Sequence, residues 1–94
     1  MPSVLCISAI KSVADRYKAA LERAGYSVVT ACGVQEAVNL LAEKRFNAVL
    51  IGPYMSDKAA LAAQIKSYSP LTCVLALLRE RERAVPGVHC LPTG

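Results

Sequence analysis

Apolar and polar positions along the chain fall into two alternating patterns, short apolar runs and longer segments with helical spacing. The apolar runs are rich in β-branched residues and predict five strands, over residues 3–7, 26–31, 48–51, 72–77 and 88–91. Between the first four of them, apolar residues recur every three or four positions and predict three helices, over residues 12–24, 33–44 and 56–69. Such βαβ units, with right-handed crossovers, predict a parallel sheet with helices on both faces. We expect one α/β domain over residues 1–94, with strand order 2-1-3-4-5.

Capping signals indicate where the helices begin and end. Ser12 and Asp15 have the spacing of a capping box, and Gly25 is a natural C-terminal stop. Gly33 can cap the second helix, with Glu36 placed to reach back toward it. The predicted buried stripes of the second and third helices are Val34, Ala37, Val38 and Leu41, and Leu61, Ile65 and Tyr68.

The run of residues 46–55 is the centre of the predicted fold. Residues 48–51 are apolar on both faces, as in a strand covered by helices above and below. Gly52 and Pro53 then end the strand, since proline cannot donate to a sheet and glycine weakens a strand interior. The chain therefore turns at the carboxyl edge of the sheet, where open parallel sheets bind their ligands.

Composition and charge narrow the function classes. Hydrophobic residues make up 54% of the chain and aromatic residues only 5%, so the core is built mainly from aliphatic side chains. No apolar run approaches a membrane span and the N-terminus lacks a signal-peptide pattern, so we expect a cytoplasmic protein. The net charge of +4 is spread among acidic residues along the chain. This distribution is typical of a solvated surface and does not favour nucleic-acid binding.

The four cysteines have no spacing that predicts a metal site or a redox pair. Cys6 and Cys73 lie in apolar runs and are expected to be buried, reduced and inert. Cys90 neighbours His89, but adjacent residues of a strand point to opposite faces. The sequence therefore predicts no metal, no cofactor and no enzyme, although an active cysteine or His89 stays an alternative.

Two stretches, residues 20–31 and 36–51, resemble the receiver domain of bacterial two-component response regulators. The likeness runs from Val4 to Met55 without a gap and resumes at residues 65–70 and 90–92. It implies a flavodoxin-like three-layer sandwich and a role in phosphorelay signalling. Receivers use an acidic pair after the first strand to hold Mg²⁺ and an aspartate after the third strand to accept phosphate.

The residues at these positions carry none of that chemistry. The acidic-pair positions are Ser8 and Ala9, and the acceptor position is Gly52. The family's hydroxyl residue aligns with Leu78, or with Leu77 if the register slips, and its lysine aligns with Thr93 or, less well, with Leu91. The resemblance therefore implies a pseudo-receiver, a signalling module that is not phosphorylated and acts through a protein partner.

The end of the chain departs further from the receiver pattern. The fourth helix is reduced to residues 78–84 and no fifth helix can form before Gly94, which suggests C-terminal truncation. Without a fifth helix, one face of the first, third and fourth strands would expose apolar side chains to water, at a cost of about 25 cal/mol per Å². We expect a homodimer to cover this face.

A small-ligand or anion site is the alternative function. The amino ends of the first and third helices, near Ser12 and Ser56, point unpaired N–H groups toward the carboxyl edge of the sheet. Stabilisation by phosphate or a nucleotide would favour this alternative.

Overall fold

The computed structural model describes residues 2–52, 58–68, 70–78 and 89–92. Strands and helices alternate as the sequence predicts. The elements in chain order are β1 (Ser3–Ile7), α1 (Lys11–Arg23), β2 (Ser27–Ala31), α2 (Val34–Glu43), β3 (Ala48–Ile51), α3 (Lys58–Tyr68), β4 (Cys73–Leu78) and β5 (His89–Pro92). The bounds of β1 and β3 are those predicted, and the others differ by one or two residues, the usual uncertainty at element ends.

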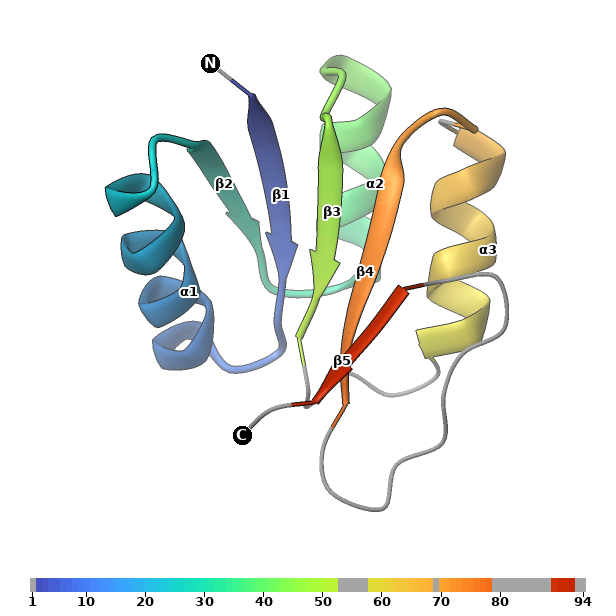
Figure 1. Cartoon of the computed structure of the whole chain (residues 1–94). Helices are drawn as coiled ribbons and strands as arrows, with labels where there is room; N and C mark the ends of the chain where they lie inside the picture. The colour runs from blue at the N-terminus through green and yellow to red at the C-terminus, as the bar shows by residue number, and fades with distance from the viewer. Residues whose placement is uncertain (1, 53–57, 69, 79–88, 93–94) are drawn as a thin grey trace.

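The five strands form one parallel sheet in the predicted order, β2-β1-β3-β4-β5 (Figure 1). In the centre of the sheet, Leu5 of β1 pairs with Val29 of β2 on one side and Val49 of β3 on the other. Because the strands are parallel, their carboxyl ends share one edge, at the bottom of Figure 1. Their amino ends share the opposite edge, at the top.

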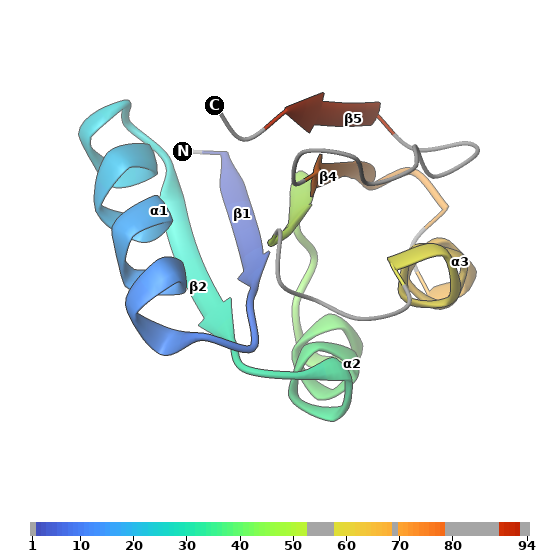
Figure 2. The same ribbon diagram turned by 90° about the horizontal axis from the view of Figure 1, so that it is seen from below.

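Helices cover both faces of the sheet, so the predicted flavodoxin-like three-layer sandwich is confirmed. Figure 2 shows α1 on one face, and α2 and α3 on the other. Each strand alternates its side chains between these faces, as a sheet requires. Residues 48–51 are apolar on both faces because helical layers lie on both sides of the sheet.

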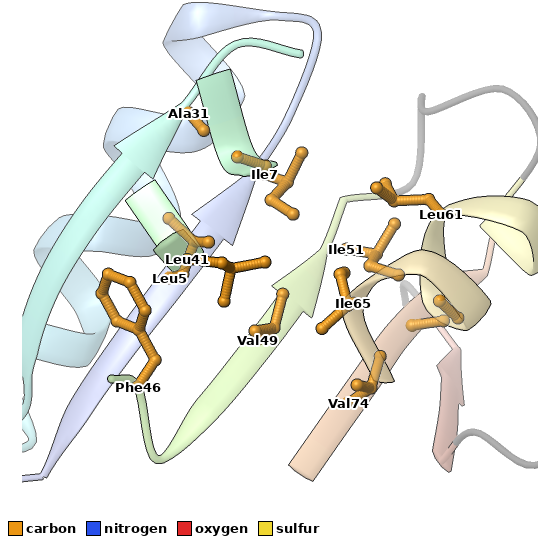
Figure 3. Close-up of a cluster of buried hydrophobic side chains, with 13 residues drawn as sticks. Leu5, Ile7, Ala31, Leu41, Phe46, Val49, Ile51, Leu61, Ile65 and Val74 are labelled. Carbon is orange, nitrogen blue, oxygen red and sulfur yellow. The ribbon is translucent and has the colours of Figure 1, made fainter. Parts of the chain in front are cut away.

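The larger hydrophobic cluster lies between the sheet and the pair α2 and α3 (Figure 3). Aliphatic side chains dominate it, and Phe46 is the one aromatic member among the described residues. The largest fully buried members are Leu5, Ile7, Val49, Ile51 and Ile65. Burying a side chain of this size stabilises the fold by roughly 1.5–3 kcal/mol.

A second cluster fills the other face, between the sheet and α1. Its buried members are Val4, Cys6, Val28, Leu50 and Leu77, and Tyr17 and Leu21 of α1 pack against them. The expectation that this face would be open to water is therefore wrong for most of its residues. Among its members in β3 and β4, only Ala48 and Leu75 are half-buried.

The predicted capping box at the start of α1 is also wrong. The helix begins at Lys11 with Ile10 as its N-cap, and no side chain caps it. Ser12 is therefore already inside the helix and exposed. At α2 the prediction is confirmed, because Gly33 is the N-cap and the Glu36 carboxylate accepts a hydrogen bond from the Cys32 N–H at 3.2 Å.

Three residues of the predicted helical stripes, Val34, Val38 and Tyr68, lie outside the two hydrophobic clusters. Val34 is 40% exposed and Tyr68 is 53% exposed. Each lies at one end of its helix, where the surface of the sheet no longer covers the stripe. Leu40 of α2 and Ala62 of α3 contact the core instead.

Gly25 ends α1 as predicted. Its φ of +97° is a left-handed conformation that glycine adopts at little cost. The Tyr26 N–H donates to the Leu21 carbonyl and the Gly25 N–H donates to the Glu22 carbonyl, both at 3.1 Å. This is the Schellman pattern, which satisfies two carbonyl groups at the helix end.

Several predictions lie outside the described residues. One is the shortened fourth helix over residues 78–84, of which only Leu78 is described, as the last residue of β4. Another is the Ser56 cap of α3. Among the helices of the described residues, none is long and apolar enough to cross a membrane.

Candidate functional site

The carboxyl ends of β1 and β3 bring together two of the predicted site positions, Ser8 and Gly52. Ile7 pairs with Ile51 as the last residue of each strand, so Ser8 and Gly52 follow side by side. The Gly52 N–H donates a short hydrogen bond of 2.7 Å to the Ile7 carbonyl oxygen. We call this pair, Ser8 and Gly52, the carboxyl-edge site.

Residue 52 has no room for a side chain. A Cβ atom there would lie 2.9 Å from the Ile7 carbonyl oxygen, 3.1 Å from the Ser8 Cβ and 3.3 Å from the Ser8 Oγ. The first contact is with backbone, which cannot rotate away. Glycine is therefore required at this position by the close approach of β1, and not by its own φ angle.

The Ser8 side chain is buried and already has hydrogen-bond partners. Its hydroxyl accepts from the Ile10 N–H at 3.3 Å and donates to the Ile10 carbonyl at 3.2 Å. These bonds fix the turn that leads from β1 into α1, which explains why Ile10 precedes the helix without a capping side chain. Ala9, the next residue, is exposed and offers only a methyl group.

These residues do not fit a magnesium ion. Mg²⁺ in proteins is bound through carboxylate oxygens and water. Neither Ser8, Ala9 nor Gly52 supplies a carboxylate, and the described residues contain no group of three or more His, Cys, Asp or Glu side chains that could hold a metal.

The other two predicted positions are less defined. Leu78 is the last residue of β4 and pairs with Pro92 of β5. Leu77, the other candidate of the hydroxyl position, is buried in the α1-side cluster. Leu91, the lesser candidate of the lysine position, is in β5, whereas Thr93 lies outside the described residues.

The alternative anion site gains no support from the described residues. Ser12 is the second residue of α1 and makes no capping hydrogen bond at its amino end. Ser56 lies outside the described residues.

The cysteines differ from one another in exposure. Cys6 is fully buried, and this burial raises the pKa of its thiol to about 11. Cys32 and Cys73 are free and exposed. The prediction of a buried Cys73 is wrong because the residue opens β4 at the amino edge, where helical cover ends.

A hollow at the amino edge of the sheet was not predicted. It has a volume of about 630 Å³ and lies between the connections that lead from α2 to β3 and from α3 to β4. We call it the amino-edge hollow. Its lining includes Leu41, Lys44, Arg45, Phe46, Tyr68 and Leu71. The sequence signal that could have revealed it is the apolar Leu71 directly after Pro70, outside any predicted strand.

No protein-family model matches the chain, and no curated protein sequence resembles it significantly. Solved structures of similar fold include receiver domains of response regulators. A response regulator receiver domain protein from Clostridium thermocellum has a TM-score of 0.78 and 21% identity, over 86% of this chain and 68% of that one. The chemotaxis protein CheY4 of Vibrio cholerae has a TM-score of 0.79 and 21% identity, over 96% of this chain and 83% of that one.

A third structure of similar fold contains a phosphorylated aspartic acid. It is a response regulator from Burkholderia pseudomallei with a phosphorylated aspartic acid and a calcium ion. Its TM-score is 0.75 and its identity 24%, over 83% of this chain, which spans 47% of that protein. At these identities the likeness establishes the fold alone.

Proposed function

We propose that the chain is a receiver-like signalling module that is not phosphorylated and acts by binding a protein partner. Its fold is that of the receiver domains described above, which supports a signalling role. On this proposal residues 1–94 form one such domain, and the domain is not an enzyme. The free cysteines fit a reducing compartment, so the cytoplasm is its proposed location.

One observation carries the proposal, the closed space at residue 52. An acyl phosphate requires a carboxylate, and Gly52 has no side chain. Among the described residues, the neighbouring side chain of Ser8 is no replacement for the lost group, because it is buried and engaged with Ile10. Even the Cβ atom of a side chain at this position would lie 2.9 Å from the Ile7 carbonyl oxygen.

Treatment with acetyl phosphate and Mg²⁺, followed by intact-mass analysis, tests the loss of phosphorylation. We expect no mass gain of a phosphoryl group. The response regulator from Burkholderia pseudomallei, treated in parallel, is the positive control for the donor. A stoichiometric acyl phosphate on any aspartate of this chain would overturn the proposal.

A homodimer through the α1 side of the sheet remains a prediction. In β3 and β4, the apolar residues of this cluster that are partly open to a second copy of the chain are the half-buried Ala48 and Leu75. We therefore expect self-association to be weak, and a different protein to be the main partner.

A further inference from the structure

The amino-edge hollow lies at the opposite edge of the sheet from Ser8 and Gly52. Residues 44–47 connect α2 to β3 and residues 70–72 belong to the connection from α3 to β4, and both segments line the hollow. Figure 1 shows these connections at the upper edge, while β1 and β3 end at the lower one. Binding at the hollow therefore requires nothing from the residues at which receivers are phosphorylated.

Hydrogen bonds hold the two walls of the hollow together. The buried Thr72 hydroxyl donates to the Phe46 carbonyl at 3.1 Å, and the Cys73 N–H donates to the Asn47 carbonyl at 3.3 Å. On the other side, the Asn47 side-chain oxygen accepts from the Ser3 N–H at 2.8 Å. Because these bonds are already formed in the free chain, the backbone of the two walls is already ordered before anything binds there.

The lining of the hollow combines exposed apolar side chains with positive charge. Leu71 is 99% exposed and Tyr68 is 53% exposed, although both are large and apolar. Lys44 and Arg45 also line the hollow and are exposed. Among the described lining residues, Glu43 has the only carboxylate, so positive charge is in excess. Tyrosine and arginine are enriched among the residues that dominate protein interfaces.

We propose that the amino-edge hollow is the docking site for an acidic peptide segment of a protein partner, with a large apolar side chain between carboxylates. The apolar side chain would contact Leu71 and Tyr68, and the carboxylates would pair with Lys44 and Arg45. This inference rests on the proposed interaction role and assigns it a surface and a class of partner. Nucleic acid is a poorer match, because two cations beside a carboxylate do not form a path for a phosphate backbone.

A titration of the ¹⁵N-labelled full chain with a synthetic peptide, followed by NMR, tests this inference. The probe is the acetylated peptide Asp-Glu-Asp-Leu-Phe-Glu-Asp-Glu. We expect saturable shift changes concentrated in residues 41–47 and 68–72. Two control peptides, one with Ser-Ser in place of Leu-Phe and one with lysine in place of every acidic residue, are expected to bind at least about tenfold more weakly.

Surface variants separate specific docking from general attraction. The double variant Lys44→Glu, Arg45→Glu is expected to weaken binding about tenfold, and Leu71→Ser is expected to abolish it. The control is Lys11→Glu, Arg23→Glu, which makes the same charge change at exposed positions of α1. We expect less than about a twofold effect from it in moderate salt.

Four outcomes of the peptide and oligothymidylate titrations would overturn the inference. They are the absence of saturable shifts, shifts centred elsewhere, an equal loss of binding in the α1 control, and tighter binding of an oligothymidylate at the same residues. Concentration-dependent shifts at these residues without peptide would indicate a second copy of the chain and would also overturn it. The proposed function is tested separately. If the titration fails, the chain can still be an unphosphorylated module that binds its partner through another surface. An acyl phosphate would overturn the proposed function whether or not the peptide binds.

Discussion

At the scale of single residues, Gly52 is the glycine among Gly25, Gly33 and Gly52 at which an added Cβ atom would meet other atoms within 4 Å. We expect Gly52→Ala to lower the free energy of unfolding by about 1–3 kcal/mol, because its Cβ would press on the Ile7 carbonyl oxygen. Gly52→Asp should lose at least as much, since its carboxylate would also be desolvated. Urea denaturation of the two variants and the wild type measures both losses.

The same variants test whether phosphorylation can be restored. Gly52→Asp is expected to stay unlabelled by acetyl phosphate, because Ser8 and Ala9 supply no carboxylate for Mg²⁺. Gly52→Ala, which has the same steric problem without a carboxylate, is the matched control. An unchanged midpoint for Gly52→Ala would show that the space at residue 52 is not closed.

Cys6 should make stability depend on pH in the alkaline range. Its thiol pKa is raised by burial from 9.0 to about 11, so the folded state keeps a proton that the unfolded state loses. The free energy of unfolding keeps its full contribution from Cys6 below pH 9, where both states are protonated. It falls by about 2–3 kcal/mol as the pH rises from 9 through 11, because the unfolded state loses the proton first. Urea denaturation at about pH 8 and pH 10.5 measures the change.

Other groups titrate in this range as well, so the comparison needs a variant. Cys6→Ala removes the thiol, and the difference between its pH dependence and that of the wild type isolates Cys6. Equal pH dependence in the two proteins would contradict the assignment. Alkylation gives a second measure: Cys32 and Cys73 are exposed and should react in the native state, whereas Cys6 should react only after unfolding.

At the scale of elements, the end of α1 depends on one backbone conformation. Gly25→Ala is expected to cost about 1 kcal/mol, because a Cβ is strained at a φ of +97° even though no atom lies within 4 Å of it. Gly25→Asn should lose less, since asparagine tolerates left-handed conformations better than alanine. Thermal denaturation of both variants tests this order, and a larger loss for asparagine would contradict it.

The strands could be predicted from sequence and the helix starts only in part. Residues 48–51 are apolar on both faces, a pattern that only a central strand covered on both sides requires. By contrast, the start of α1 is fixed by the Ser8 hydroxyl and the Ile10 backbone, a bond that no capping pattern includes. Helical spacing also placed Tyr68 in the core, because spacing gives the direction of a side chain but not the extent of the sheet beneath it.

The candidate site, like the starts of the helices, could be predicted from the sequence only in part. The resemblance assigned Ser8 and Gly52 as site positions, the predicted strand order placed them at adjacent strand ends, and the structure brings them together. The closed space at residue 52 was not predictable, since it depends on how closely the backbone of β1 approaches β3. The amino-edge hollow was missed because residues 44–47 and 70–72 are distant in sequence and meet only through tertiary contacts such as the hydrogen bond between Thr72 and Phe46.

At the scale of the whole molecule, we expect the α1 side of the sheet to support only weak self-association. Leu50 and Leu77 on this side are only 7% and 8% exposed in a single chain, so most of the apolar area that a dimer would bury is already covered. A stable interface buries at least about 1,200 Å² in total, which Ala48 and Leu75 alone cannot supply. Sedimentation velocity should therefore show a monomer at low protein concentration, with association only at about 0.1 mM protein or above.

Leu75→Lys tests whether this weak association uses the α1 side of the sheet. The side chain is half-buried there, and the charge should remove association while thermal denaturation shows that the variant is folded. Leu71→Lys places the same charge at the amino edge, where the native side chain is 99% exposed, and should leave self-association unchanged. A tight dimer at micromolar concentration, or one that Leu75→Lys does not affect, would locate the dimer interface on another surface.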